Sequence, residues 1–132
     1  MLICCVIALL FCITGNAKVP YIPKIINYSV SDYKAGNQNW AVSQGPGGKM
    51  YIGNNRGLLV FDGIHWDLVK LPNNLGVRAL YISKDGRIYV GSFEEFGYFE
   101  MDDENDLIYH SLSSSEMNVY LNNDEFWTIN EW

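Results

Sequence analysis

The sequence has few cysteines, and all of them lie at one end. The three are Cys4, Cys5 and Cys12, and each belongs to an apolar run over residues 1–13. The chain after this run, residues 14–132, therefore contains no cysteine. Disulfide bonds do not stabilise that part.

Basic residues are also scarce. The chain has 9 Lys and Arg against 15 Asp and Glu, which gives a formal net charge of -6, and it contains no basic run. Proteins that bind nucleic acids concentrate Lys and Arg on one face. Direct contact with nucleic acid is therefore excluded for this segment.

Residues for catalysis or metal binding are equally sparse. The two histidines, His65 and His110, have no Cys, His or carboxylate at metal-ligand spacing. Glu94 and Glu95 are adjacent in the chain, and neighbouring residues of a strand point to opposite faces, so this pair cannot flank one bond. The acidic run 102–106 lacks the glycine and glutamate of a calcium loop and predicts a solvated turn. We therefore predict no catalytic residue, no metal and no cofactor.

The apolar start of the chain favours export. Residues 1–13 are too few to span a bilayer comfortably as a helix, but they fit the core of a secretory signal. Gly15 and Ala17 supply small residues for a cleavage site. No Lys or Arg precedes Lys18, so an uncleaved membrane anchor is the alternative. Both interpretations predict a periplasmic or extracytoplasmic protein.

An internal repeat is the most informative feature that is present. Residues 40–53 match residues 78–91 at a constant offset of 38 positions, since 78 minus 40 and 91 minus 53 both give this value. Propeller blades typically repeat at about 40 to 50 residues. Each copy contains a strand, a glycine turn, a second strand that ends in glycine, and two further strand patterns. Four strands per repeat predict the blade of a β-propeller.

Alternation within the second strand of each copy predicts which side chains are buried. Met50 and Ile52 lie on one face of the first copy, and Ile88 and Val90 lie on the matching face of the second. We expect both pairs to be buried between blades.

The domain organisation follows from the repeat. We predict an all-β chain, a β-propeller fragment with two four-stranded antiparallel blades and the start of a third, after an N-terminal signal helix. The predicted boundaries are 1–17 for a signal peptide or membrane anchor, 18–38 for a lead-in segment, 39–75 for blade 1, 76–112 for blade 2, 113–124 for a connection and 125–132 for the start of a truncated blade 3. A blade buries its faces only against its neighbours, so we expect the sequence to be part of a larger propeller.

A set of short motifs carries a resemblance to a known family. The motifs are Gln38-Asn39-Trp40-Ala41, Tyr51-Ile52-Gly53-Asn54-Asn55, Gly57-Leu58-Leu59, Phe61-Asp62-Gly63, Val77-Arg78 and Gly91-Ser92-Phe93-Glu94-Glu95-Phe96-Gly97-Tyr98. Together they resemble the N-terminal part of two-component-regulator propeller proteins, which are bacterial sensor-regulators. The resemblance covers residues 25–132.

The resemblance implies a modular protein. In that family a periplasmic propeller precedes an immunoglobulin-like module with three characteristic tyrosines, a membrane helix, and a histidine kinase or helix-turn-helix output. The motif at residues 91–98 is closer to the variant with a DNA-binding output. None of these modules is present in this sequence, so the expected partners are downstream modules of the full-length chain, and the expected membrane contact is through the N-terminal segment or that downstream helix. Ligands of the family include oligosaccharides from complex glycans.

Three residues recur where the innermost strand of each predicted blade begins. They are Trp40, Arg78 and Trp127. In a propeller these strand starts surround the central channel, where an aromatic ring or an arginine can stack on a sugar or hydrogen-bond to it. We therefore predict that these three residues bind the ligand. The alternative is structural: the tryptophans fill the packed axis, and Arg78 pairs with a neighbour.

The sequence thus predicts the ligand-sensing propeller of a bacterial signal-transduction and transcription regulator, and not an enzyme. The expected ligand is a small molecule or an oligosaccharide. Two alternatives remain open: a propeller enzyme, such as a lyase or glycoside hydrolase with its catalytic groups on other blades, and a protein-binding scaffold. The fold by itself does not choose among them.

Overall fold

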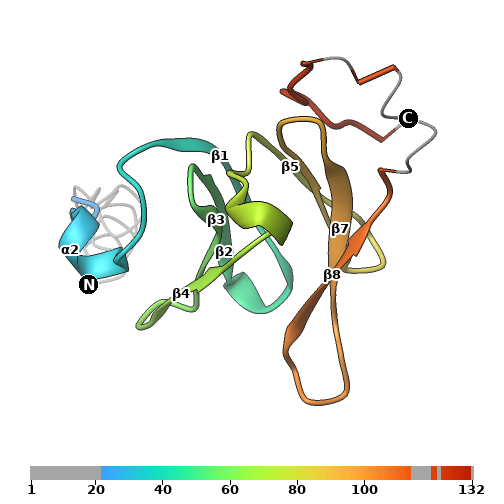
Figure 1. Cartoon of the computed structure of the whole chain (residues 1–132). Helices are drawn as coiled ribbons and strands as arrows, with labels where there is room; N and C mark the ends of the chain where they lie inside the picture. Colours follow the sequence, from blue (N-terminus) through green and yellow to red (C-terminus); the bar gives the residue numbers. More distant parts are fainter. Residues whose placement is uncertain (1–21, 114–119, 122, 132) are drawn as a thin grey trace, which may run out of the picture.

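The computed structural model describes residues 22–113, 120–121 and 123–131 (Figure 1). The predicted signal peptide or anchor at residues 1–17 lies outside the described residues, as do residues 114–119 and 122 of the predicted connection at 113–124. Within the described part, no helix has the length and apolar character needed to cross a membrane.

Eight strands form two separate four-stranded antiparallel sheets, each in chain order (Figure 1). The first sheet contains β1 (Asn39–Gln44), β2 (Met50–Asn54), β3 (Gly57–Phe61) and β4 (Trp66–Val69). The second sheet contains β5 (Ala79–Ile82), β6 (Ile88–Gly91), β7 (Phe96–Met101) and β8 (Leu107–Ser111).

Helix is limited to short turns in the described residues. These are α2 (Val30–Tyr33) and the 3-10 turns η1 (Pro46–Gly48) and η2 (Pro72–Asn74). The predicted all-β architecture with two four-stranded blades is therefore confirmed. We call the first sheet blade 1 and the second blade 2.

Strand register preserves the sequence repeat. Ala41 pairs with Gly53 in blade 1, and Ala79 pairs with Gly91 in blade 2. The shift is again 38 residues, since 79 minus 41 and 91 minus 53 agree. Trp40 falls at an irregularity of the β1–β2 ladder, immediately before the regular pairing begins. The two blades are thus copies of one structural unit.

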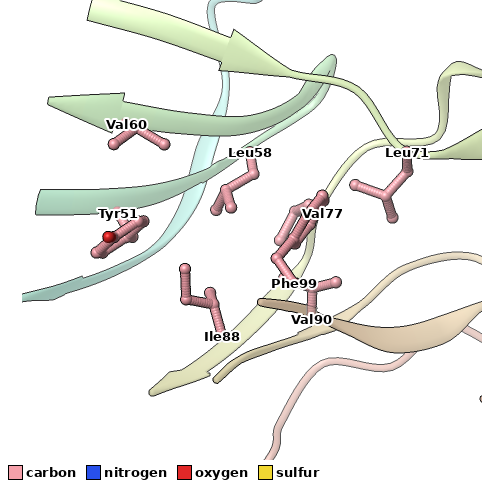
Figure 2. Close-up of a cluster of buried hydrophobic side chains, with 8 residues drawn as sticks. All are labelled: Tyr51, Leu58, Val60, Leu71, Val77, Ile88, Val90 and Phe99. Atoms are coloured by element: carbon pink, nitrogen blue, oxygen red, sulfur yellow. The ribbon is translucent and has the colours of Figure 1, made fainter. Parts of the chain in front are cut away.

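The two sheets pack face to face around one hydrophobic core (Figure 2). Side chains from both sheets and from the linker between them contribute to this core, and its buried members are Tyr51, Leu58, Val60, Leu71, Val77, Ile88, Val90 and Phe99. Burying a Val, Leu or Phe side chain contributes about 1.5–3 kcal/mol each. The contact between the blades therefore makes a large contribution to folding.

Ile88 and Val90 lie in this core as predicted, but Met50 and Ile52 do not. Side chains alternate along β2, and Tyr51 is the one that turns toward blade 2. Met50 and Ile52 are half-buried on the opposite face. There Met50 pairs with Phe61, whose ring lies 5.1 Å from that of Tyr28 in the lead-in segment. The two pairs lie on matching faces, as predicted, but a blade meets the preceding and the following blade with opposite faces, so Met50 and Ile52 point away from blade 2.

The predicted start of blade 3 contacts blade 2 as the start of blade 2 contacts blade 1. The Val77 amide donates to the Asn54 carbonyl at 2.9 Å, and the Phe126 amide donates to the Ser92 carbonyl at 3.0 Å. We call residues 123–131 the third-blade segment. One antiparallel bridge, between Phe93 and Glu125, joins it to blade 2, and its described residues form no strand of their own.

Candidate ligand site at the starts of the inner strands

The structure brings the three predicted ligand residues together. The Arg78 guanidinium carbon lies 4.6 Å from the centre of the Trp40 ring and 5.7 Å from that of Trp127. The two indole rings are 5.5 Å apart and meet edge to face at 79°. We call this group the Trp-Arg-Trp cluster. These contacts join residues that are far apart in the chain: Arg78 is 38 positions after Trp40 (78 minus 40), and Trp127 is 49 positions after Arg78 (127 minus 78).

Equivalent backbone positions place these side chains. Trp40 lies at the beginning of β1, and Arg78 immediately precedes β5, where its amide donates to the Gly91 carbonyl at 2.8 Å. Trp127 follows Phe126, whose amide is bonded to blade 2. Three successive units therefore bring the same point of their innermost segment to one location. This is the convergence that the repeat predicts for a propeller axis.

Both tryptophans remain accessible in the cluster. Trp40 is 41% exposed and Trp127 is 54% exposed, whereas the Arg78 side chain is 22% exposed. A cation near the face of an indole ring contributes about 0.5–2 kcal/mol, depending on how far it is desolvated. The tryptophans therefore contact the guanidinium and still present apolar surface to solvent in this part of the propeller.

A fourth member of the site, Glu125, was missed by the sequence reasoning. Its Oε1 accepts a hydrogen bond from Arg78 Nε at 3.3 Å, and the Glu125 side chain is 26% exposed. The structural alternative for Arg78, pairing with a neighbour, is therefore also realised. Arg78 Nη1 is enclosed and has no hydrogen-bond partner among the described residues. No local signal identifies Glu125, because it is 47 residues from Arg78 in the chain.

The two larger cavities described on the blades lie elsewhere. One, of about 470 Å³, lies between the outward face of blade 2 and the third-blade segment, and its lining includes Tyr81, Tyr89 and Glu131. The other, of about 700 Å³, lies between the β1–β2 and β5–β6 turns and includes Lys49 and Arg87. Neither cavity includes a residue of the Trp-Arg-Trp cluster. The cluster is an open aromatic platform on this part of the chain, since both of its tryptophans are exposed.

The histidines occupy surface positions with structural partners. His65 lies in the turn before β4, and its Nδ1 is 3.2 Å from Asp62 Oδ2. His110, in β8, contacts Glu100 at 3.0 Å and stacks on Tyr98. The described residues contain no group of three or more His, Cys, Asp or Glu side chains arranged to hold a metal ion.

The adjacent carboxylates Glu94 and Glu95 hold different partners. Glu94 Oε1 accepts from the Asn123 amide at 2.8 Å, which ties the third-blade segment to blade 2. Glu95 Oε1 accepts from the hydroxyls of Tyr109 at 2.7 Å and Ser111 at 2.6 Å. Burial raises the pKa of Tyr109, and the hydrogen bond to Glu95 raises it further, so the phenol stays a donor. Both carboxylates serve the structure of the blade edges.

Comparison with known proteins identifies one family. Residues 70–94 match the family model described as two component regulator propeller. This is the family that the sequence motifs resemble, so the resemblance is confirmed. The matched residues run from the end of blade 1 through β5 and β6 and include Arg78. Searches of the curated proteins and of the solved structures find no match to the chain.

Proposed function

We propose that this chain, which carries a two component regulator propeller match at residues 70–94, is a ligand-sensing part of a bacterial signal-transduction regulator. The Trp-Arg-Trp cluster is where it contacts its ligand. The observation that carries this proposal is the convergence of Trp40, Arg78 and Trp127 from three successive repeat units, with both indoles accessible.

The chemistry of the cluster suits a small polar ligand or an oligosaccharide. An indole face packs against the C–H face of a sugar ring, while the planar edges of Arg78 and Glu125 exchange hydrogen bonds with its hydroxyls. The carboxylate of this site is paired with Arg78 at 3.3 Å. Ligand binding is therefore the function that we propose.

Location and output form part of the same proposal. The apolar run at residues 1–13 favours export, so the propeller works on the extracytoplasmic side of the membrane. A ligand that touches both Trp40 and Trp127 joins blade 1 to the third-blade segment. Ligand binding would thus be transmitted along the ring of blades to a downstream output module, which in the related regulators is a kinase or a transcription factor.

A protein-binding scaffold is the second candidate. Exposed tryptophans and arginines dominate the binding energy of many protein interfaces, so the same exposure of Trp40 and Trp127 fits a protein partner. The two candidates differ in what is bound and not in where it binds.

The test is ligand titration followed by tryptophan fluorescence. The native chain is titrated with a panel of neutral and acidic oligosaccharides, and Trp40→Ala, Arg78→Ala and Trp127→Ala are compared with Tyr120→Ala, a control at a highly exposed aromatic outside the cluster. We expect each cluster variant to weaken binding by about tenfold or more, the loss of one buried polar or aromatic contact. Unchanged binding in all three variants, or no binding of any panel member by the native chain, would overturn the proposal.

A further inference from the structure

Glu125 is held in place by the backbone on both sides of it. The Glu94 amide donates to the Asp124 carbonyl at 2.9 Å, the Phe126 amide donates to the Ser92 carbonyl at 3.0 Å, and Glu125 itself forms the bridge with Phe93. These contacts fix the backbone of Glu125, and the hydrogen bond from Arg78 Nε positions its carboxylate in the site. Its partner Arg78 is equally fixed between the two indole rings.

Arg78 has no free two-point edge for an acidic ligand. Arginine binds carboxylates best through two adjacent N–H groups that form a fork. One such edge contains Nε, which donates to Glu125 at 3.3 Å, and the other contains Nη1, which is enclosed. A ligand carboxylate would have to displace Glu125 before it could form the fork.

Electrostatics act in the same direction. Arg78 and Glu125 form a pair with no net charge, and the whole chain carries a formal net charge of -6. Glu125 therefore cancels the attraction that Arg78 alone would offer to an acidic ligand at short range, and the negatively charged chain would repel such a ligand at long range. Hydroxyl groups have no such cost, because they can donate to Glu125 and accept from Arg78.

We infer that Glu125 is the specificity-determining residue of this site, and that it admits uncharged, hydroxyl-rich ligands and rejects ligands that carry a carboxylate. This inference rests on the proposed function of the Trp-Arg-Trp cluster. It adds the charge class of the ligand and the residue that selects it.

The first test needs no ligand and uses charged and uncharged quenchers of tryptophan fluorescence. Glu125→Gln keeps the shape and an oxygen acceptor for Arg78 but removes the charge. We expect quenching by iodide to increase about twofold in this variant as the local potential becomes positive, with quenching by neutral acrylamide unchanged. The control is Glu104→Gln in the exposed β7–β8 turn, which changes the net charge equally. Equal iodide quenching in the two variants would overturn the inference.

The second test uses matched oligosaccharides of glucose and of glucuronate with the same linkage and length. We expect the native chain to bind the neutral member about tenfold tighter, and Glu125→Gln to remove most of this difference. A native chain that prefers the glucuronate member overturns the inference but leaves the proposed ligand site intact. Failure of the native chain to bind either member, or any sugar of the wider panel, overturns the proposed function, and the quenching result still decides whether Glu125 sets the local charge.

Discussion

Gly53 lies directly against the backbone of Val77. A Cβ atom at position 53 would come within 2.9 Å of the Val77 carbonyl oxygen and within 2.9 Å of its Cγ1. Val77 is fully buried where the chain enters blade 2. The same relationship recurs one blade later, where a Cβ on Gly91 would lie 2.5 Å from that of Phe126. The glycine at this repeated position therefore allows the backbone at the start of the next unit to pack closely against each blade.

The first prediction concerns this junction. Gly53→Ala should destabilise the chain by about 1–3 kcal/mol, the usual cost of overpacking, because the obstructing atom belongs to backbone that cannot rotate away. Val77 is anchored by its own hydrogen bond to Asn54, so relief by movement would break a second contact. Chemical denaturation followed by circular dichroism measures the change. An unchanged midpoint would show that the junction is looser than this geometry requires.

The second prediction concerns the core between the blades. Phe99 is fully buried in this core, so Phe99→Ala should cost about 3–5 kcal/mol through lost burial and a residual cavity. Phe93 is 39% exposed and lies outside the core, so Phe93→Ala should cost much less. Denaturant midpoints of the two variants give the comparison. Similar losses of stability in the two variants would mean that the core between the blades does not dominate the stability of the chain.

The third prediction concerns a buried amide. Asn54 Oδ1 accepts from the amides of Gly36 at 2.9 Å and Arg56 at 3.0 Å, and its Nδ2 donates to the Gly36 carbonyl and to Asn39 Oδ1, both at 2.7 Å. Asn54→Asp has almost the same shape but removes both donors and adds a buried charge. We expect a loss of about 2–4 kcal/mol, since each abandoned buried polar group costs about 1–3 kcal/mol.

The equivalent residue of blade 2 supplies the control for Asn54. Ser92 Oγ donates one hydrogen bond, to the Gly76 carbonyl at 2.6 Å, so Ser92→Ala should cost only about 1–3 kcal/mol. Thermal melts of the two variants measure which substitution lowers the stability of the chain more. A smaller loss for Asn54→Asp than for Ser92→Ala would contradict the importance assigned to the Asn54 network.

The sequence predicted the features that local physics determines. Strand alternation and glycine placement in two copies at one offset predict the two four-stranded blades, because turns and side-chain periodicity depend on neighbours in the chain. The same repeat placed Trp40, Arg78 and Trp127 at equivalent points. Their contact then follows from the symmetry of the units and needs no further information.

Long-range contacts without a repeat partner could not be predicted. Glu125 reaches Arg78 only because the third-blade segment docks on blade 2, and nothing near Glu125 in the chain indicates this. The aromatic contacts of Tyr28 with Phe61 and Trp66 depend equally on how the lead-in segment folds back. Alternation likewise placed Met50 and Ile52 on the face that matches Ile88 and Val90, but it did not indicate that Tyr51, on the opposite face, would meet blade 2.

The fourth prediction concerns the turn before β4. Asp62 Oδ1 accepts from the amides of His65 at 2.6 Å and Ile64 at 2.7 Å. These backbone bonds, first that of His65 and then that of Ile64, are the main reason that the pKa of Asp62 falls to about 2, and the His65 ring adds a smaller effect. The unfolded chain has a value of about 3.9. Because the folded pKa is lower, the stabilisation is present above pH about 4 and is lost as the pH falls toward about 2.

Replacement of the ring separates these causes. His65→Ala removes the imidazole but retains both amides, so the pKa of Asp62 should stay well below its ordinary value. NMR titration of the Asp62 carboxyl carbon in the native chain and in this variant provides the measurement. A return to the ordinary value in His65→Ala would show that the ring, and not the turn, holds the charge.

The last prediction separates a ligand-contacting tryptophan from a packing one. Trp40 is 41% exposed, so Trp40→Ala should cost no more than about 1–2 kcal/mol of stability while it weakens ligand binding. Trp66 stacks on Phe61 at 4.3 Å and meets Tyr28 and Tyr33 at 5.2 and 5.6 Å, so Trp66→Ala should cost about 3–5 kcal/mol and leave the affinity of the folded fraction unchanged. Thermal melts run beside the oligosaccharide titration give both quantities for each variant. If Trp40→Ala destabilises the chain as much as Trp66→Ala does, and binding falls only in proportion to the unfolded fraction, then Trp40 is a packing residue and the ligand must be sought on other blades.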